Sequence, residues 1–237
     1  MIEQQKQHRI SENWRAVQQK VREAAVRAGR DPDSVQIIGV SKYVDAETTS
    51  ALVQAGCRQL GESRPQVMWQ KADALKLGQT VTWHMIGHLQ RNKVRRSLRY
   101  LPLIHSVDSQ RILAAIADEA SSQGLAVEVL LEVNISGDEG KTGFLPESLD
   151  AVLDSLPTAG VQVRGLMAMA GWGTSSDAAR VQFDKTRELR DRLCLSSGRT
   201  LPELSMGMSG DFTEAIRAGS TMVRIGSMLF EGVTDRN

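Results

Sequence analysis

The sequence predicts an α/β protein built as a single closed (β/α)8 TIM barrel, and three observations support this fold class. Apolar segments with strand character alternate with helical segments along the chain, which gives eight strand–helix units. Most strand segments are continuously apolar, a pattern typical of a parallel sheet buried on both faces. The length of 237 residues also suits such a barrel. We expect one domain over residues 1–237, with a doubly wound open sheet as the alternative.

An extra helix precedes the first barrel unit. Residues 2–28 are mostly polar, but apolar residues such as Trp14 and Val17 recur among them at helical spacing, and Gly29 ends the pattern. The first strand, residues 35–40, is short and rich in valine and isoleucine.

The remaining elements follow from the same two patterns. Helical periodicity predicts helices over residues 45–55, 65–77, 90–98, 109–122, 146–156, 177–195 and 211–218. Apolar runs between them predict strands over residues 57–60, 80–86, 103–107, 127–133, 161–169, 201–206 and 222–225. Asp108 or Ser109 is suited to cap the helix that begins there.

Composition argues against several classes of function. The formal net charge of +1 gives no strong field that would draw the protein to nucleic acid or membrane. Cys57 and Cys194 are far apart in the sequence, which is typical of a reduced compartment. The polar N-terminal segment lacks a signal peptide, and no apolar run approaches the roughly 20 residues of a membrane span. We therefore expect a soluble cytoplasmic protein.

Lys42 is the first candidate for covalent chemistry. It follows the apolar run 35–40, and active sites of parallel barrels lie at the C-terminal ends of the strands. A lysine amine attacks a carbonyl only when it is neutral, and desolvation favours the neutral form. The alternative is a solvated lysine at the end of a strand.

Two late segments resemble a cradle for phosphate. Ser209-Gly210 follows the seventh strand and Gly226-Ser227 follows the eighth, which is where phosphate recurrently binds in this barrel. Glycine allows close approach of the backbone, and serine adds hydroxyl donors. Asp211 begins a short helix whose free N–H groups favour an anion. The alternative is a pair of ordinary turns and a helix cap.

A carbonyl and a phosphate on one ligand indicate pyridoxal 5′-phosphate as the cofactor. Arg224 precedes Gly226 by two residues, so both point to the same side of the last strand. Arginine does not give up its proton, so a ring nitrogen that faced Arg224 would stay unprotonated and the ring would be a weaker electron sink. The alternative for Arg224 is a salt bridge at the barrel end.

Two further features favour simpler interpretations. His84 and His88 lack a third ligand nearby in the sequence, so we predict no metal site. The basic segment from Arg91 to Arg99 is interpreted as a solvated helix face. Phosphate, RNA or a partner protein are its alternatives, and its lack of interleaved aromatic residues disfavours single-stranded nucleic acid.

The motifs together resemble the pyridoxal 5′-phosphate homeostasis protein family (YggS-like, also called proline synthetase co-transcribed homologues), over nearly the whole chain. The motifs that carry the resemblance are Val40-Ser-Lys42, Gly61-Glu62, Trp83-His-Met-Ile-Gly-His-Leu-Gln-Arg-Asn-Lys93, Val133-Asn-Ile-Ser136, Lys141-Thr-Gly143, Gly165-Leu-Met167, Leu204-Ser-Met-Gly-Met-Ser209 and Gly219-Ser-Thr-Met-Val-Arg-Ile-Gly226.

The resemblance implies a fold-type III barrel like the N-terminal domain of alanine racemase. In such a barrel Lys42 carries the cofactor as an internal aldimine, and Arg224 faces the ring nitrogen. The phosphate contacts implied are Ser209, Gly226 and Ser227.

Ser63 and His84 complete the expected set of cofactor contacts. The chain departs from the family's pattern at Ser63, where an asparagine is usual. It departs again over residues 168–173, which read Ala-Met-Ala-Gly-Trp-Gly where many relatives have a proline-bearing loop.

A binding and delivery protein is the function we predict, with no confident catalytic residue. A racemase needs a base on each face of the bound cofactor. The chain ends soon after the eighth unit, without the β-domain that supplies a tyrosine in fold-type III racemases. Of its tyrosines, Tyr43 adjoins Lys42, and neighbours on a strand point to opposite faces. We therefore expect a monomer that binds pyridoxal phosphate reversibly and delivers it to apoenzymes, affecting amino-acid and vitamin B6 balance.

Other functions remain open from the sequence. The first is a pyridoxal-phosphate-dependent amino-acid racemase or lyase. The others are a Schiff-base aldolase without cofactor, and an RNA- or protein-binding module that uses the segment from Arg91 to Arg99.

Overall fold

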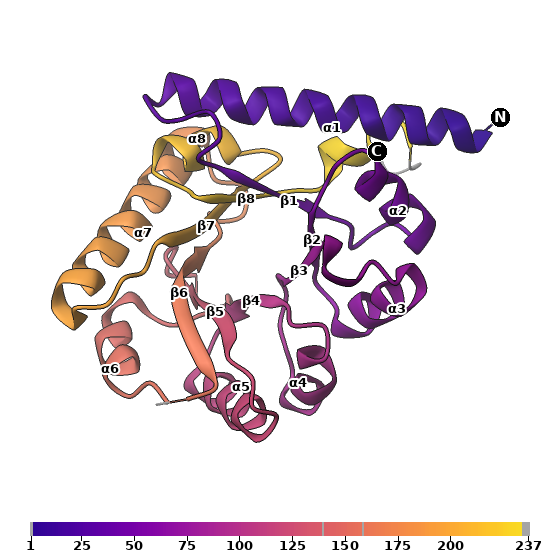
Figure 1. Ribbon diagram of the computed structural model, residues 1–237. Coiled ribbons are helices and arrows are strands. Elements are labelled where there is room, and N and C mark those ends of the chain that lie inside the picture. The colour runs from indigo at the N-terminus through magenta and orange to yellow at the C-terminus, as the bar shows by residue number, and fades with distance from the viewer. Residues whose placement is uncertain (1, 139, 158, 234–237) are drawn as a thin grey trace.

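Eight parallel strands close into a barrel in their order along the chain, and β8 pairs with β1 (Figure 1). The computed structural model describes residues 2–138, 140–157 and 159–233, so parts of the expected domain 1–237 lie outside the described residues. The strands are β1 (Gln36–Val40), β2 (Gln59–Glu62), β3 (Thr82–Met85), β4 (Leu103–Val107), β5 (Val127–Val133), β6 (Val161–Ala168), β7 (Glu203–Met208) and β8 (Met222–Ile225). The predicted barrel is confirmed, and the open-sheet alternative is wrong.

The α-helices lie outside the barrel in Figure 1. They are α1 (Ile2–Arg27), α2 (Ala46–Gln54), α3 (Pro65–Leu75), α4 (Arg91–Leu98), α5 (Gln110–Ser122), α6 (Leu149–Asp154), α7 (Ser176–Ser197) and α8 (Phe212–Arg217). Short 3-10 turns form η1 (Gly78–Thr80), η2 (Pro146–Ser148) and η3 (Ser227–Phe230). Within the described residues, no helix is long and apolar enough to cross a membrane.

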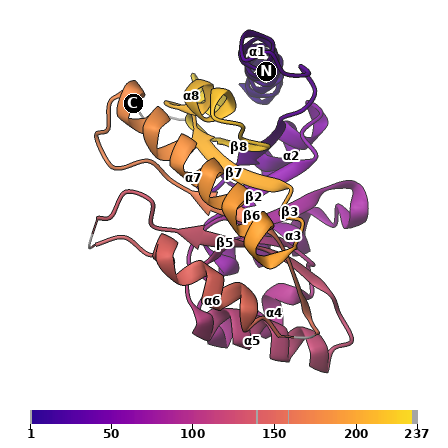
Figure 2. The same ribbon diagram turned by 90° about the vertical axis from the view of Figure 1, so that its left-hand side faces the viewer.

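The extra N-terminal helix is confirmed as α1, which lies along the outside of the barrel. Its side chains at Ile10, Trp14, Val17 and Val21 are buried, because the three- and four-residue spacing places them on one face. This face packs on α2, α8 and η3. Figure 2, turned by 90°, also shows α1 outside the barrel beside α2 and α8.

Two strands are displaced as a whole by two residues toward the C-terminus relative to the prediction. β2 was expected over 57–60 and spans Gln59–Glu62, because its last residue is a buried glutamate that local hydrophobicity does not reveal. β7 was expected over 201–206 and spans Glu203–Met208, with a register shift against β8. Both strands therefore end closer to the candidate site than expected.

The barrel interior contains a small apolar layer. Gly39 in β1 points outward, since a Cβ placed there would lie 2.8 Å from the sulfur of Cys57. The alternating side chain of Ile38 therefore points inward. There it forms one buried cluster with Leu103, Leu130, Met167 and Met222, all of which belong to strands.

Gly165 permits a close approach between two strands. A Cβ at this position in β6 would lie 1.8 Å from the carbonyl oxygen of Glu203 in β7. Any larger residue would separate the strands at this point, which explains the glycine of the Gly165-Leu-Met167 motif.

Candidate functional site

Lys42 lies in the turn after β1. The amide of Val44 donates to the carbonyl of Ser41 at 3.0 Å, so the chain turns here rather than continuing the strand. In this turn the amine of Lys42 lies 4.9 Å from the centre of the Tyr43 ring. The expectation that Lys42 and Tyr43 point to opposite faces is therefore wrong, because that alternation belongs to strands.

A buried polar cluster fixes the residue before Lys42. The hydroxyl of Ser41 donates to Glu62 Oε1 at 2.7 Å, and Lys71 Nζ donates to the same oxygen at 2.5 Å and to the Ser41 carbonyl at 2.7 Å. The side chains of Lys71 and Glu62 are only 4% and 0% exposed. We call Ser41, Glu62 and Lys71 the Ser41 clamp, and it holds the turn in place from the α3 side.

The two segments predicted to bind phosphate lie in contact. The amide of Gly226, after β8, donates to the hydroxyl of Ser209, after β7, at 3.2 Å. A Cβ on Gly226 would lie 3.5 Å from Val40, so the ends of β7, β8 and β1 meet here. Ser227 is exposed at the start of η3, and a Cβ on Gly210 would have no heavy atom within 4 Å. Hydroxyl and amide donors thus gather beside the turn that carries Lys42.

Arg224 is a buried cation held by neutral acceptors. Its Nη1 donates to the carbonyl and the hydroxyl of Ser205, both at 2.7 Å, and its Nη2 donates to the carbonyl of Ala168 at 3.1 Å. No carboxylate of the described residues lies within 4.0 Å of the guanidinium, so the salt-bridge alternative is wrong. Burial lowers the pKa of Arg224 to about 10, which the more distant carboxylates of Asp211 and Glu132 partly oppose.

Both of those carboxyl groups are themselves partly desolvated. Burial raises the pKa of Glu132 and outweighs the hydroxyl of Thr142, which donates to it at 2.7 Å. Burial also raises the pKa of Asp211, whose Oδ1 accepts from the amide of Met208 at 2.6 Å. Asp211 therefore folds back onto the loop after β7.

His84 lies inside the barrel rather than on its rim. Its Nε2 is 2.7 Å from Gln59 Oε1, and its Nδ1 is 2.8 Å from His105 Nε2. His105 Nδ1 is in turn 2.8 Å from the hydroxyl of Ser205, which also contacts Arg224. We call these five residues the barrel chain. The structure thus places His84 behind Arg224, two side chains away.

Burial keeps both histidines of the barrel chain neutral. It lowers the pKa of His84 to about 3. The pKa of His105 is lowered well below its usual value by burial first, and further by the charges of His84 and Arg224.

Ser63 follows β2 and packs against the loop after β3. A Cβ on Gly87 would lie 2.4 Å from the Ser63 carbonyl oxygen, so only glycine fits there. Ser63 is half-buried at the same end of the barrel as Lys42.

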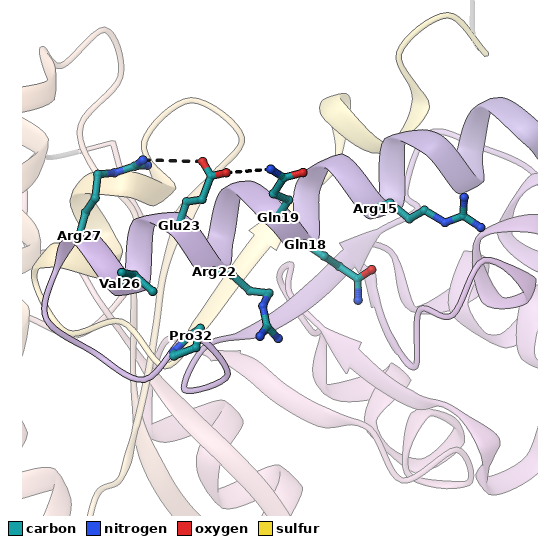
Figure 3. Close-up of a pocket in the computed structure, with 8 residues that line it drawn as sticks. All are labelled: Arg15, Gln18, Gln19, Arg22, Glu23, Val26, Arg27 and Pro32. Atoms are coloured by element: carbon teal, nitrogen blue, oxygen red, sulfur yellow. Dashed lines mark hydrogen bonds and ion pairs between the residues drawn. The ribbon is translucent and has the colours of Figure 1, made fainter.

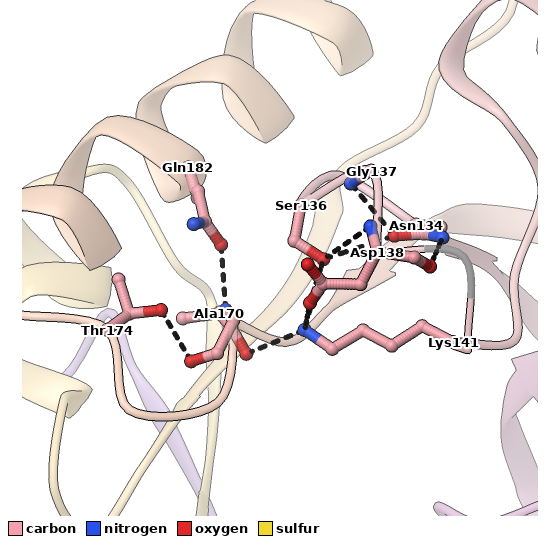
Figure 4. Close-up of polar contacts among 9 residues, drawn as sticks. Asn134, Ser136, Gly137, Asp138, Lys141, Ala170, Thr174 and Gln182 are labelled. Atoms are coloured by element: carbon pink, nitrogen blue, oxygen red, sulfur yellow. Dashed lines mark hydrogen bonds and ion pairs between the residues drawn. The ribbon is translucent and has the colours of Figure 1, made fainter.

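The loops after β5 and β6 are tied together (Figure 4). Lys141 Nζ donates to Ser136 Oγ and to the carbonyl of Ala170, both at 3.1 Å, and pairs with Asp138 at 3.0 Å. Within this frame, Trp172 is fully exposed on the loop where the chain departs from the family's pattern.

A broad hollow lies away from these groups, on the outer face of α1 (Figure 3). It has a volume of about 750 Å³ and is lined mostly by charged and polar residues of α1, together with Val26 and Pro32. Arg27 pairs with Glu23 at 3.7 Å along its rim. It contains none of the predicted site residues and offers a solvated helix surface, so we place the chemistry at the strand ends.

The basic helix α4 is partly neutralised. Arg96 stacks at 4.5 Å on the Trp69 ring and pairs with Asp73 at 3.6 Å, and Arg95 pairs with Glu119 at 3.6 Å. His88, just before this helix, contacts Asp108 through Nδ1 at 2.6 Å. Within the described part of the chain, no group of three or more potential metal ligands comes together.

Sequence reasoning missed the partners of the predicted residues. Ser205, His105 and Lys71 were not among the residues predicted for the site. Ser205 lies on the barrel-facing side of β7 opposite Met222 of β8, which places it beside Arg224. Strand register could have indicated this pairing, whereas nothing local marks Lys71 on α3.

The fold and these groups define a (β/α)8 barrel with a lysine beside a cradle of hydroxyl and amide donors and a buried arginine. The family model for the alanine racemase N-terminal domain matches residues 6–233. The pyridoxal phosphate homeostasis protein of Aquifex aeolicus is 39% identical over 215 residues, covering 90% of this chain and 94% of that protein. The protein of the same name from Deinococcus radiodurans is 40% identical over 216 residues, covering 91% and 98%. The chain therefore belongs to the alanine racemase N-terminal domain family and, within it, to the pyridoxal phosphate homeostasis proteins.

Solved structures agree with this assignment. PipY of Synechococcus elongatus PCC7942 with pyridoxal phosphate (PLP) bound matches with a TM-score of 0.78 and 34% identity, over 88% of this chain and 98% of PipY. PipY without PLP matches with a TM-score of 0.85 and 33% identity, over 93% and 99%. Alanine racemase from Corynebacterium glutamicum, at a TM-score of 0.69 and 14% identity, shares the fold over 60% of its own chain.

Proposed function

We propose that this protein binds pyridoxal 5′-phosphate reversibly through Lys42 and delivers it to enzymes that require it. The observation that carries the proposal is that the C-terminal ends of β1, β7 and β8 lie in contact. Gly226 lies 3.5 Å from Val40 at the Cβ position and bonds to Ser209 at 3.2 Å, while Lys42 follows Val40 by two residues. A primary amine and a phosphate cradle therefore lie on neighbouring strand ends.

The residues present suit this cofactor. Ser209 and Ser227 supply hydroxyls, and Gly210, whose Cβ position meets no heavy atom within 4 Å, leaves its backbone open to an anion. The Gly226 amide holds the Ser209 hydroxyl in place. Ser63 is the remaining candidate contact at this end of the barrel. His84 is linked to the same region through His105, Ser205 and Arg224.

When bound, the cofactor supplies an aldehyde that links reversibly to primary amines and a ring that withdraws electrons. Arg224 offers only donors, so it would hold the ring through an unprotonated nitrogen and would repel a protonated one. The Ser41 clamp fixes the turn that carries Lys42, so the amine is presented from a rigid strand end.

The relatives support the same cofactor. Proteins named for pyridoxal phosphate homeostasis are 39% and 40% identical to this chain, and PipY has PLP bound. The free thiols Cys57 and Cys194 agree with a location in the cytoplasm. A monomer is our proposed oligomeric state, with mass from light scattering as its test.

We propose delivery rather than turnover because the second base of a racemase is lacking among the residues placed at the site. Tyr43 lies against Lys42, on the same side, and Tyr100 donates to Asp73 at 2.8 Å beside α4. A racemase or lyase is the alternative, and the contact between Lys42 and Tyr43 is the feature that favours it.

The cofactor is tested by absorbance and borohydride trapping. Purified protein mixed with pyridoxal phosphate should show a visible band that borohydride removes, with the added mass on the peptide containing Lys42. Lys42→Arg keeps the charge but cannot form the link, so it should lose the band. Lys185→Arg, an exposed lysine on α7, is the matched control and should keep it. A band that persists in Lys42→Arg would contradict the assignment.

Delivery is tested with an apoenzyme. Loaded protein should activate a pyridoxal-phosphate-requiring apoenzyme even when a scavenger of free cofactor is present. Amino acids incubated with the loaded protein alone should keep their configuration. Sustained racemisation or release of a new product would establish the enzymatic alternative.

A further inference from the structure

We propose that the barrel chain holds Arg224 in one orientation, with Ser205, His105, His84 and Gln59 as positioning residues. Every bond of this chain points the same way: each group donates to the next, from Arg224 across the barrel interior to Gln59. The proposal rests on the proposed function, because it assigns a purpose to the orientation of Arg224 toward the cofactor ring.

The direction of the barrel chain follows from what each group can donate. A guanidinium only donates, so the hydroxyl oxygen of Ser205 must accept from Arg224 Nη1 at 2.7 Å. The hydroxyl proton is then directed to His105 Nδ1 at 2.8 Å. His105 uses its remaining nitrogen, Nε2, to donate to His84 Nδ1 at 2.8 Å.

The barrel chain ends at Gln59, and its last hydrogen bond has the same direction as the others. His84 Nε2 donates to Gln59 Oε1 at 2.7 Å. A neutral imidazole has one donor and one acceptor, so each histidine is used fully and in a single tautomer. Burial of both rings, at 1% and 0% exposure, keeps them neutral and supports this arrangement.

The opposite direction is disfavoured. It would need His105 Nδ1 to donate to Ser205 Oγ, which already accepts from Arg224. The Ser205 proton would then lack an acceptor among the bonds of the described residues, and a buried unsatisfied group is costly. The amide of Gln59 would also have to turn over to donate to His84.

Arg224 needs such support because no carboxylate of the described residues lies within 4.0 Å of it. Its Nη atoms are held by the carbonyls of Ser205 and Ala168 and by the Ser205 hydroxyl. Neutral acceptors hold a cation by directional hydrogen bonds rather than by charge. The orientation of the guanidinium therefore depends on Ser205, and through it on His105, His84 and Gln59.

Gln59 gives access to the chain from the far side of the barrel. It is half-buried and borders a hollow of about 260 Å³ that is also lined by Trp14, Gln36 and Arg58. Gln36 and Gln59 are the first residues of β1 and β2, so this hollow lies at the end of the barrel opposite Lys42. A change here can alter the chain without touching the cofactor site.

The first measurement uses the cofactor-free protein. Hydrogen exchange at the Arg224 guanidinium, followed by NMR, should quicken about tenfold in Ser205→Ala, which loses one buried charge-assisted hydrogen bond. His105→Gln and Gln59→Ala should quicken it by progressively smaller factors, and Ser205→Thr, which keeps the hydroxyl, should restore slow exchange. His8→Gln, an exposed histidine on α1, is the matched control.

The second measurement uses pyridoxal phosphate labelled with ¹⁵N in its ring. The wild type should keep the ring nitrogen unprotonated at neutral pH. In Ser205→Ala and His105→Gln the pH midpoint of ring protonation should rise by about one unit, the equivalent of a tenfold change in population. A simple loss of packing would lower the melting temperature without moving this midpoint.

The outcomes separate this inference from the proposed function. Unchanged Arg224 exchange and an unchanged ring midpoint in folded variants would overturn the positioning role. Gln59→Ala carries the test if Ser205→Ala does not fold. If the wild type forms no link with the cofactor, the proposed function fails, while the exchange measurement on cofactor-free protein still decides whether the chain holds Arg224.

Discussion

Two buried polar clusters lie at this barrel, and they are built on opposite principles. The Ser41 clamp sits between the barrel and α3 and contains an ion pair, in which Lys71 and Glu62 meet at 2.5 Å. The barrel chain crosses the interior through neutral groups and ends at Arg224, a cation with no carboxylate within 4.0 Å among the described residues.

This difference in charge pairing indicates that the Ser41 clamp serves the fold, whereas Arg224 is kept available for a ligand. In a buried ion pair the two charges neutralise each other, so removing one partner leaves a costly charge behind. In the clamp, Ser41 and Lys71 both bond to Glu62 Oε1, and the buried Glu62 Oε2 has no hydrogen-bond partner among the described residues. Arg224 has its charge only partly satisfied, and burial lowers its pKa to about 10. We therefore expect the Ser41 clamp to control the free energy of unfolding and the barrel chain to control the binding of the ligand.

The largest expected effect comes from breaking the clamp. Lys71→Met should lower the free energy of unfolding by about 3–5 kcal/mol, because Glu62 is left buried without its cation. Denaturant unfolding measures this. Arg180→Ala, which breaks a surface pair with Asp184, is the matched control and should change stability by less than about 1 kcal/mol. Adding Glu62→Leu to Lys71→Met should recover most of the loss, and a failure to recover would mean that packing dominates.

A second, intermediate effect is a loss of folding stability as the pH falls. The folded-state pKa of His84, about 3, lies below its usual value of 6.5, so the unfolded chain binds the proton more readily. Stability from this group is fully present above pH 6.5 and is lost as pH falls toward 3. Between pH 7 and 5 it should decrease by about 2 kcal/mol for His84, with a loss in the same direction for His105.

A comparison with a variant isolates that loss. The raised pKa values of Glu132 and Asp211 act in the opposite direction, because those groups favour the folded state as pH falls. His84→Gln should flatten the pH dependence of unfolding relative to the wild type, measured by denaturant titration at pH 7, 6 and 5. An equal slope in both proteins would show that the buried histidine does not control it.

The smallest expected effect on stability comes from the end of the barrel chain. Arg224→Gln leaves carbonyl acceptors unpaired but also removes a buried, unpaired cation, so the two costs offset to within about 1–2 kcal/mol. The affinity of the Arg224→Gln variant for pyridoxal phosphate should fall about tenfold or more, as measured by fluorescence titration. A large loss of stability with unchanged affinity would place Arg224 in the fold rather than in the ligand site.

The sequence predicts the site's strands better than its contacts. Lys42, Ser209 and Gly226 could be placed at strand ends because parallel barrels put all such ends at one face. Ser205 and Lys71 could not be placed, since each depends on which distant element lies opposite it. The predicted β2 missed Glu62 for the same reason, because a buried glutamate looks polar until its lysine partner on α3 is known.

His84 illustrates the limit most clearly. Its position in the Trp83-His-Met-Ile-Gly-His motif predicts a cofactor contact, which stays a prediction. The motif could not show that His84 also meets His105, which lies on the neighbouring strand β4. Side-chain direction on a short strand depends on register, and one residue of shift would have moved it to the other face.

By itself, the sequence determined the alternation of strands and helices, the closed parallel barrel, and the strand ends that carry the lysine and the cradle. It could do so because hydrophobic periodicity and glycine turns are local properties. Only the tertiary structure decided that Lys42 turns against Tyr43, that Lys71 neutralises Glu62, and that Gln59 connects to Arg224 through two histidines. Those facts depend on distances between elements remote in the chain, which packing fixes and local sequence does not encode.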